Sequence, residues 1–585
     1  MIQVEQLSYS FPQKDLYHDV SFSILPGQHC VLCGSNGTGK STLLDILVHT
    51  EDYILHRGKV VKDPACVIGY IPQYFVHDRA AGETVFDLLA SGYRQMQAEL
   101  DALCAEMAGE AADPSVFDRY QAALEKFEAA DGYNYESTIS RQLALAGLQH
   151  TAGFPLSQIS GGEYKLVQIL RAMLLSPELL VLDEPDAFLD FENIAGLSRL
   201  INGFRGAVLA VTHNRFLLAS CFDKVLHLEG EGLREYDGSY AEYQLFLMRM
   251  KAEKQTAARK DAEWIEIQEQ LVEKLRDDAT KVIDPYRGNL LRARVSYLER
   301  LQKWKTEEPF LEAREVSMAF PAVSEEAEDG REYALKAEDF RLAFSDAPLL
   351  EHVSFTLAPH EKLALVGKNG TGKTSLLRAS VHGASPAVSV APETKIGFLS
   401  QNYEETLHMD RSILDELEDL GLPDRSSVEQ CLRPYCFEAD ALEQTIASLS
   451  GGEKNLLQLA KLSLSGADLL ILDEPSSHLD LPSQLALEKA IREYRGAVLM
   501  VSHDFYTIVN CADAVLYADG GTIRRMSMRA FRKMFYRQYF KADYLLLEQQ
   551  KTELELQIAA RLRRNDSAGA LALCDALEEV LAKMK

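Results

Sequence analysis

The sequence predicts an α/β protein in which one kind of domain occurs twice. The segment GSNGTGKS, which begins at Gly34, recurs as GKNGTGKT from Gly367. An apolar run that ends at Asp183 recurs with its end at Asp473. Such runs are typical of buried parallel strands, whose carboxyl ends meet at the ligand-binding edge of a sheet. We therefore expect two P-loop domains with parallel sheets, together with helical segments that are not part of the repeat.

Composition places the chain among globular proteins. Its 585 residues carry 88 acidic and 61 basic side chains, a formal net charge of −27, and 47% are hydrophobic. That length predicts about three to five folded units, and the composition excludes a disordered or fibrous chain. The sequence contains neither a run of about 18 apolar residues nor the pattern of a secretory signal. We expect a cytoplasmic protein that crosses no membrane.

The nine cysteines are an odd number, and their scatter is typical of reduced cytosolic thiols. Cys30 and Cys33 have the spacing of a metal-binding pair, but they lie in an apolar run with no second pair nearby. Cys431 and Cys436 are likewise isolated. We expect these four to be buried or idle rather than metal ligands.

Both glycine-rich segments follow a short apolar run and precede a helical pattern, as a P-loop requires. The glycines let backbone N–H groups turn toward phosphate oxygens, and the helix N-terminus adds a favourable dipole. Lys40 and Lys373 would reach the β and γ phosphates, and Ser41 and Thr374 would hold Mg²⁺. ATP and Mg²⁺ are therefore the expected cofactors. The predicted nucleotide-binding residues here are Gly34, Asn36, Gly37, Gly39, Lys40, Ser41 and Thr42, and Gly367, Asn369, Gly370, Gly372, Lys373, Thr374 and Ser375.

The apolar runs that end at Asp183 and Asp473 are each followed by a glutamate, so each run ends in two carboxylates. Asp183 and Asp473 suit the coordination shell of Mg²⁺, while Glu184 and Glu474 are placed to polarise an attacking water as general bases. For either run alone, a core strand that ends in an exposed acidic turn explains the residues better. The P-loop in the same repeat favours the catalytic interpretation.

Other residues recur at matched positions. Ser160-Gly161-Gly162 and Ser450-Gly451-Gly452 each begin 23 residues before the aspartate, and His213 and His503 each follow it by 30. Gln73 and Gln401 fill a third matched slot, which predicts nucleotide binding and a further ligand for Mg²⁺. Phe11 and Phe344 each stand 23 residues before the first glycine, suited to stacking on adenine or, equally, guanine. A lone histidine or phenylalanine is more often core filling, but the equal spacing favours catalytic histidines and nucleotide-stacking aromatics.

These motifs together resemble the ATP-binding cassette (ABC) family over about 450 of the 585 residues. In that family the Ser-Gly-Gly-Glu loop completes the nucleotide site of the opposite cassette. The resemblance implies one site from Lys40 with Ser450 and Gly452, and another from Lys373 with Ser160 and Gly162. It also implies a monomer whose two cassettes close on ATP and reopen after hydrolysis.

The first cassette contains an insertion that the second lacks. Gln73 lies 87 residues before Ser160, whereas the matched residues of the second cassette are 49 apart. The insertion predicts two amphipathic helices, residues 85–107 and 116–130. Residues 79–136 carry 4 basic and 12 acidic side chains, so this arm suits a protein or solvent surface better than RNA.

Two other segments are basic. The linker, residues 244–306, predicts a long helix, a break at 283–285 and a second helix from about Asn289, with 14 basic and 10 acidic side chains. It is either a solvated spacer or a basic-tipped hairpin directed toward RNA. Residues 524–564 carry 11 basic and 4 acidic side chains with interleaved aromatics, which form either a packing face or base-stacking platforms. The negative charge therefore belongs to the arm and the cassettes.

The expected domains are cassette one at 1–243 with the arm at 79–136, a helical linker at 244–310, cassette two at 311–523 and a helical C-terminal extension at 524–585. This organisation resembles the ABC-F family. The resemblance implies an ATPase that binds the ribosome near the exit tRNA site and modulates translation, in some members protecting it from antibiotics. It implies rRNA and tRNA contacts through the linker, with the C-terminal extension as a further candidate, and a ribosomal protein contact through the arm.

Two other functional classes share the cassettes. A twin-cassette motor of a membrane importer would need neither the arm nor the helical linker. A DNA-repair or chromosome ATPase would call for zinc-spaced cysteines or a far longer coiled coil inside a cassette.

Cassette one departs from cassette two after the carboxylates. Phe188 stands where cassette two has His478, and Asn214 stands where it has Asp504. The family's loop at this place contacts the opposite site, so we expect unequal communication between the halves. Both glutamates are present, so we expect both sites to hydrolyse ATP, at different rates.

Overall fold

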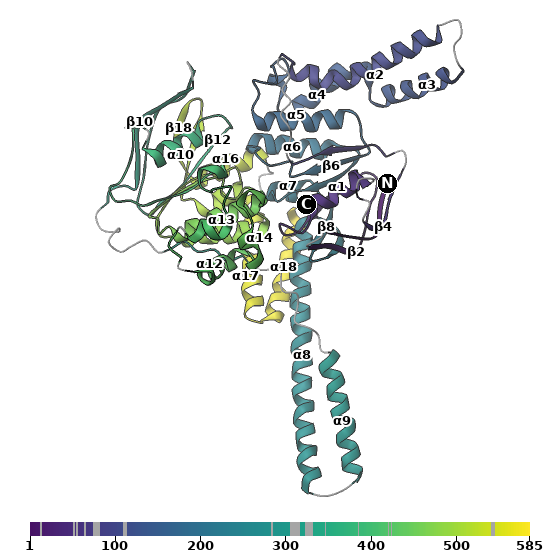
Figure 1. Ribbon diagram of the computed structural model, residues 1–585, viewed down its shortest axis with the longest axis vertical. Helices are drawn as coiled ribbons and strands as arrows, with labels where there is room; N and C mark the ends of the chain where they lie inside the picture. The colour runs from purple at the N-terminus through teal and green to yellow at the C-terminus, as the bar shows by residue number, and fades with distance from the viewer. Residues whose placement is uncertain are drawn as a thin grey trace. The chain divides into compact units, whose positions relative to one another are not determined.

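The computed structural model describes residues 1–584, except 12–13, 51–52, 54–55, 64–65, 74–81, 109–113, 282–284, 305–315, 322–330, 345–346, 384, 419, 423 and 540–543. The chain divides into two compact units (Figure 1). The first joins Met1–Asp237 to Glu315–Phe535, and the second joins Gly238–Arg314 to Tyr536–Lys585. The repeated cassettes lie in the first unit and the long helices in the second.

Cassette one is built on a mostly parallel sheet. Its strand order is β5 (Ile68–Ile71), β6 (Leu179–Asp183), β7 (Ala207–Val211), β3 (His29–Cys33), β8 (Lys224–Glu229) and β9 (Gly232–Asp237). Neighbours pair in parallel except β8 and β9. Every residue of β6 and β7 is buried, as the apolar runs predict. A second, antiparallel sheet has the order β2 (Lys14–Ile24), β1 (Ile2–Phe11) and β4 (Arg57–Lys62).

Helices connect these strands. They are α1 (Lys40–Val48), α4 (Tyr135–Ala146), α5 (Gly161–Leu174), α6 (Phe191–Gly203) and α7 (Arg215–Ser220). Because α1, α5, α6 and α7 begin just after a strand end or a motif predicted from the sequence, the functional residues collect at helix N-termini and at the carboxyl ends of strands. This is the edge where parallel α/β sheets bind ligands.

Cassette two repeats this topology. The parallel sheet has the order β14 (Ile396–Leu399), β15 (Leu469–Asp473), β16 (Ala497–Val501), β12 (Lys362–Gly367), β17 (Ala514–Asp519) and β18 (Thr522–Ser527). The antiparallel sheet has the order β11 (Ala347–Leu357), β10 (Leu335–Phe344) and β13 (Val388–Val390). The helices are α10 (Lys373–His382), α11 (Ile413–Glu418), α12 (Arg425–Leu432), α13 (Gly451–Leu464), α14 (Leu481–Glu493) and α15 (Phe505–Cys511).

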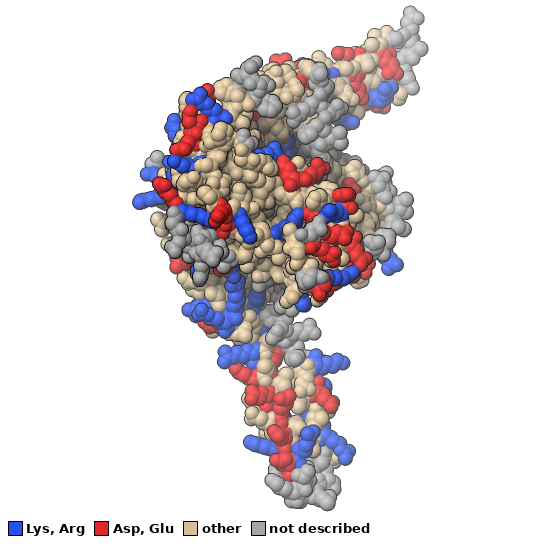
Figure 2. All heavy atoms as spheres, turned by 60° about the vertical axis from the view of Figure 1, so that its left-hand side comes forward, with Lys and Arg blue, Asp and Glu red and all other residues tan. Residues whose placement is uncertain are grey.

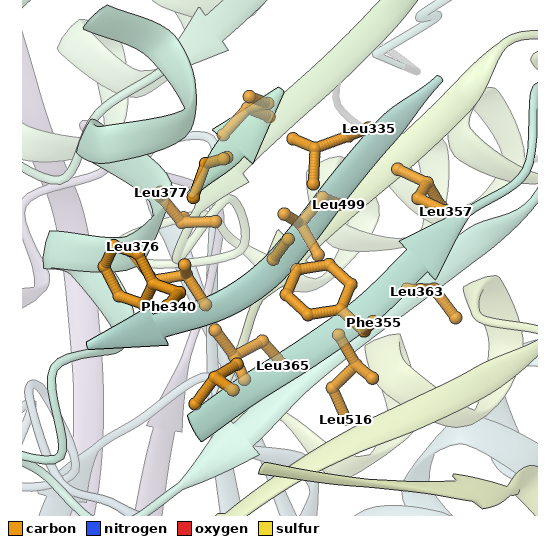
Figure 3. Packing of buried hydrophobic residues seen from close by; sticks show 14 of the residues in the cluster. Leu335, Phe340, Phe355, Leu357, Leu363, Leu365, Leu376, Leu377, Leu499 and Leu516 are labelled. Atoms are coloured by element: carbon orange, nitrogen blue, oxygen red, sulfur yellow. The ribbon is translucent and has the colours of Figure 1, made fainter. Parts of the chain in front are cut away.

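The core of cassette two lies between its two sheets and α10. Figure 3 shows Phe340 and Phe355 of the antiparallel sheet facing Leu365 of β12, with Leu376 and Leu377 of α10 in the same cluster. All five side chains are buried. Since both leucines lie in the first turns of α10, this packing fixes the N-terminus of that helix, where the P-loop ends.

The arm forms two helices, α2 (Val85–Met107) and α3 (Pro114–Ala129), as predicted. Their contact is an apolar cluster that includes Leu103 and Phe127. The helix α3 begins two residues earlier than expected, because Pro114 suits the first turn of a helix, where an N–H is not needed. Residues 79–81 of the expected arm and its turn at 109–113 lie outside the described residues.

The second unit contains α8 (Tyr240–Lys281), α9 (Pro285–Trp304), α17 (Tyr544–Arg563) and α18 (Ser567–Met584). Helices α8 and α9 run side by side as a hairpin (Figure 1), joined by Arg294, which donates to Gln268 at 3.0 Å. The helix α9 begins at Pro285 and not near Asn289 as expected, again because proline is tolerated in a first turn. Among the described helices, none is long and apolar enough to cross a bilayer.

The C-terminal helices pack on the linker, which the sequence does not predict. Ile558, Cys574 and Leu577 are buried against Leu245 and Ala252 of α8. Polar contacts reinforce this cluster: Arg249 donates to Asp575 at 2.6 Å and to Glu578 at 3.0 Å. The linker and the C-terminal extension, expected as separate segments, therefore share a hydrophobic core.

Two of the C-terminal aromatics serve packing. Phe531 and Phe535 on α16 (Met528–Tyr539) are buried, and the ring of Phe535 stacks on Phe505 with centroids 4.1 Å apart. For these two, the packing interpretation is confirmed. The side chains of the aromatics at 536, 539, 540 and 544 lie outside the described residues.

We expect Ile558→Ala to destabilise the helices of the second unit by about 2–5 kcal/mol, since it opens a cavity in their shared core. Native-state hydrogen exchange of the α17 and α18 amides measures this locally. Leu556→Ala is the matched control on the same helix, because Leu556 is 59% exposed; its effect should stay within about 0.5 kcal/mol. Equal losses in the two variants would contradict the packing described above.

Candidate functional site

The two P-loops hold their lysines in the same way. The Lys40 ammonium donates to the carbonyl oxygens of Gly34 and Ser35 at 2.8 and 2.9 Å. Lys373 donates to Gly367 at 2.8 Å and to the next carbonyl at 2.7 Å. Both lysines are buried, and burial lowers the pKa of each. The loops therefore each present one positive charge enclosed by backbone.

Glycine is required at the last position before each lysine. Gly39 and Gly372 have φ of 91° and 86°, in the left-handed region, at the N-caps of α1 and α10. A Cβ on Gly39 would lie 2.6 Å from the Tyr17 hydroxyl oxygen, and one on Gly372 would lie 2.7 Å from Leu342. A side chain at either position would thus be strained and would clash with its neighbour, so both turns need glycine.

The aspartates at the ends of β6 and β15 fit a divalent cation. Asp183 and Asp473 are buried, and Oδ1 of the first and both oxygens of the second have no hydrogen-bond partner among the described residues. Burial raises the pKa of Asp183 to about 6, although a hydrogen bond with Ser41 opposes the rise. Burial likewise raises the pKa of Asp473, opposed by Thr374. Buried, unsatisfied carboxylate oxygens beside a hydroxyl are a donor set that Mg²⁺ prefers.

Glu184 is held by side chains from both cassettes. Gln73 donates to its Oε2 at 2.7 Å, and Nδ1 of His478 lies 3.2 Å from the same oxygen. Burial disfavours its charge, but the hydrogen bond to His478 and the charge of Lys40 outweigh burial and lower the pKa of Glu184 to about 2. Burial lowers the pKa of His213 to about 4.

Among the described residues, Glu474 has no such partner in the opposite cassette. Its Oε2 accepts from the backbone N–H of His503 at 3.1 Å, and its Oε1 accepts no hydrogen bond from the described part of the chain. Burial and the charge of Asp473 raise the pKa of Glu474 to about 8, and burial lowers the pKa of His503. The pKa values of the matched glutamates therefore shift in opposite directions, and Glu184 has the hydrogen bonds from Gln73 and His478. Cassette one has Phe188 at the position that matches His478.

Both glutamates have a strained backbone. Their φ angles are 44° for Glu184 and 50° for Glu474, and the matched Phe188 and His478 have 67° and 59°. Non-glycine residues rarely adopt these values. The same outliers at matched positions of both repeats are typical of a functional site, where the surrounding fold maintains such strain.

The Ser-Gly-Gly-Glu loops begin helices. Ser160 and Ser450 are the N-caps of α5 and α13, and each forms a reciprocal capping box with Glu163 or Glu453. The role of this repeated motif is thus partly structural. The remaining N–H groups of the first turn have no partner within the helix, and they are available to an anion.

Two loops contact the P-loop of the opposite cassette. We call them the post-glutamate loops, residues 186–190 and 476–480. The backbone N–H of Asn36 donates to Oδ2 of Asp480 at 3.1 Å, and its side chain donates to the His478 carbonyl at 2.8 Å. Asn369 makes the equivalent bonds to Asp190 and to the Phe188 carbonyl, both at 3.0 Å. Each P-loop is therefore bound by the post-glutamate loop of the other cassette.

These contacts assemble two composite sites. The first site has Lys40 and Glu184, and Gly452 lies so close to Asn36 that a Cβ would be 2.3 Å from the amide nitrogen. The second site has Lys373 and Glu474. It includes a cavity of about 670 Å³. Predicted residues that line this cavity are Ser160, Gly161, Gly162, Asn369, Gly370, Gly372, Lys373, Thr374, Ser375, Gln401, Asp473, Glu474 and His503, and Glu184 and His213 of the first site also reach its wall.

The structure gives little evidence on the two aromatics predicted to stack on a purine. Phe11 ends β1, is 46% exposed and contacts Tyr9 edge-on at 5.4 Å between ring centroids. Phe344 ends β10, and its side chain lies outside the described residues. The resemblance implies that this loop contacts the opposite site, but the individual contacts of His478, Asp190 and Asp480 are not among the predictions. The difference between Phe188 and His478 at matched positions is the sequence signal that points to this loop.

Known proteins share these motifs. The sequence profile of the ABC transporter family matches residues 17–187 and 350–477. The chain is 30% identical to the putative ATP-binding protein YdiF of Bacillus subtilis, covering 98% of this chain and 87% of that protein. It is 27% identical to ABC transporter F family member 5 of Arabidopsis thaliana, covering 89% and 75% of the two chains. The chain belongs to the ABC-F family. It is an ATP-hydrolysing enzyme of the twin-cassette type.

Solved structures agree with this fold. The RNase-L Inhibitor superposes with a TM-score of 0.55 at 18% identity, covering 92% of this chain and 93% of that one. A chain in a model of ribosome-bound archaeal Pelota and ABCE1 gives a TM-score of 0.56 at 19% identity, covering 91% and 80%. Both similarities concern the fold of this ABC-F protein.

We expect the two sites to respond oppositely to an exchange of Phe188 and His478. In the Glu474→Gln background only the first site turns over, and His478→Phe should slow its single-turnover hydrolysis by on the order of tenfold, because Glu184 loses its orienting partner. In the Glu184→Gln background only the second site turns over, and Phe188→His should accelerate its hydrolysis, because Glu474 gains an orienting partner. Equal residual rates of Glu184→Gln and Glu474→Gln, or the same response to both exchanges, would contradict this asymmetry.

Proposed function

We propose that this ABC-F protein binds ATP with Mg²⁺ at both composite sites and uses Glu184 and Glu474 as general bases. The observation that carries the proposal is the reciprocal binding of Asn36 and Asn369 by the opposite post-glutamate loops. It sets each P-loop against the Ser-Gly-Gly-Glu helix of the other cassette. A phosphate chain between them would gain donors from both sides and be shielded from water.

At the first site, the chain's own groups are arranged for attack by water. Gln73 and His478 orient the Glu184 carboxylate, whose low pKa keeps it ionised and able to accept a proton. His213 is neutral because it is buried, and it can hydrogen-bond to the γ-phosphate. The Lys40 ammonium offsets the negative charge of that phosphate. Bound Mg²⁺ supplies charge neutralisation at phosphate oxygens; Ser41, Gln73 and Asp183 would hold it at this site, and Thr374, Gln401 and Asp473 at the other.

At the second site, burial and the neighbouring charge of Asp473 raise the pKa of Glu474, and a cation held by Asp473 would lower it. His503 supports Glu474 through its backbone N–H. We infer that both sites hydrolyse ATP and that the first is faster.

We further propose that the partner is the ribosome, near its exit tRNA site, and that ATP-dependent closure regulates translation there, with protection from antibiotics as one form of that activity. Similar twin-cassette proteins support this, since one is described as ribosome-bound. The exposed basic side chains of the hairpin, among them Lys274, Arg276 and Arg292, suit rRNA or tRNA. Figure 2 shows basic and acidic side chains together on the described part of the hairpin. The acidic arm suits a basic ribosomal protein.

A cytoplasmic location follows from this proposal. An importer motor would need neither the arm nor the hairpin, and both are ordered helical elements here. Pairing of the cassettes within one chain also supports a monomer.

We expect the Glu184→Gln, Glu474→Gln variant with ATP to sediment with ribosomes in a sucrose gradient, because closure without hydrolysis traps the bound state. The parent protein with ADP is the control and should remain in the light fractions. If the trapped variant also stays in the light fractions, away from the 70S and 50S peaks, the ribosome assignment is wrong.

We expect Arg276→Glu with Arg292→Glu to weaken that co-sedimentation and to make it more sensitive to salt, while basal ATPase activity is retained. Arg57→Glu with Lys59→Glu, two exposed positions on β4, is the charge-matched control. A similar loss of binding in the control would show that only total charge matters.

A further inference from the structure

One arginine of cassette one is buried in cassette two. Arg215 begins α7, two residues after His213, and only 14% of its side chain is exposed. Its Nη2 donates to Asp504 at 2.9 Å and also to Glu488, and its guanidinium lies over the Tyr506 ring, 4.9 Å from the centroid. All three partners belong to cassette two. A cation that bridges two carboxylates and an aromatic face is held in a single orientation.

The arginine separates two like charges. Oγ1 of Thr507 donates to Asp504 at 2.6 Å and to Glu488 at 3.1 Å, so the two carboxylates approach the same hydroxyl. Glu488 is 2% exposed and Asp504 17%. Without Arg215 these carboxylates would repel each other across a poorly solvated space.

Asp504 links this cluster to the second site. It caps α15 by accepting from the N–H groups of Tyr506 and Thr507. The preceding residue, His503, donates its own N–H to Glu474. A rotation of Asp504 away from Glu488 would therefore move the peptide that orients the catalytic glutamate.

The arrangement occurs on one side only. The repeat places Phe505 at the position of Arg215, Asn214 at that of Asp504 and Ser198 at that of Glu488. Asn214 is neutral and caps α7 by itself, accepting from Phe216 at 3.0 Å. We call residues 213–215 and 503–505 the histidine loops. In cassette one, Asn214 at the position of Asp504 carries no charge that needs a partner from cassette two.

We propose that Arg215 is a positioning residue for hydrolysis at the second site, acting from cassette one through Asp504 and His503 on Glu474. The coupling runs from the histidine loop of the first site to that of the second. This inference rests on the proposed role of Glu474 as base, and it requires no ribosome.

The test measures kcat and KM for ATP in the full-length protein. In the Glu184→Gln background, where the second site turns over, Arg215→Met should lower kcat by about tenfold while KM changes by less than about twofold. In the Glu474→Gln background, the same substitution should change kcat by less than about twofold. Equal losses of kcat in the two backgrounds, or a loss confined to KM, would overturn the proposal.

A second substitution separates positioning from simple adhesion between cassettes. Adding Glu488→Gln to Arg215→Met removes the repulsion on Asp504 and should restore most of the kcat at the second site. An arginine that only joined the cassettes could not be rescued in this way, so absence of rescue would overturn the proposal. Arg215→Lys, which keeps the charge, should retain more activity than Arg215→Met; it serves as the test variant if the latter fails to fold.

The matched control is Arg425→Met. Arg425 also bridges two carboxylates of cassette two, Glu429 at 3.2 Å and Glu443 at 2.8 Å, but it is exposed and touches neither histidine loop. Its loss should leave both sites unchanged, and a tenfold loss of kcat would overturn the specificity claimed for Arg215. Failure of the base assignments would show separately, as turnover that persists in the Glu184→Gln, Glu474→Gln protein. In that case, rescue of the total ATP turnover of Arg215→Met by added Glu488→Gln would still test the role of Arg215.

Discussion

The register between the two cassettes depends on one interaction made twice. One oxygen of Asp480 caps the helix that follows it, accepting from Ser483, and the other accepts from the N–H of Asn36 in the opposite P-loop. Asp190 does the same with Asn193 and Asn369. A carboxylate that satisfies two helix or loop donors at once has little freedom to rotate. The relative position of each P-loop and the opposite Ser-Gly-Gly-Glu helix follows from it.

Repetition made most of the fold and much of the site predictable. The strand ends at Asp183 and Asp473 and the helix starts at Lys40 and Lys373 lie where the paired motifs place them. Such local features depend on burial and on backbone donors, which leave a clear pattern in sequence. The start of α9 at Pro285 was misplaced because a proline can either break a helix or begin one.

Contacts between distant segments could not be predicted in the same way. The packing of Ile558 on α8 joins residues about 300 positions apart, and an amphipathic pattern does not say which surface covers it. The contact of His478 with Glu184 and that of Arg215 with Asp504 likewise depend on how two folded cassettes meet. The sequence differences at Phe188 and Asn214 predict that the two sites differ. They do not predict which side chains of the opposite cassette contact each site.

The two departures from symmetry are complementary. Cassette two supplies His478 to the glutamate of the first site, and cassette one has only Phe188 at the matched place. Cassette one supplies Arg215 to the histidine loop of the second site, and cassette two has only Phe505 there. Each site thus receives one polar side chain from the other cassette, directly on the glutamate proposed as base in one case and on the loop behind it in the other. A contact to the glutamate bears on the carboxylate itself, whereas a contact to the loop bears on its placement, so the proposed asymmetry would be one of mechanism as well as of rate.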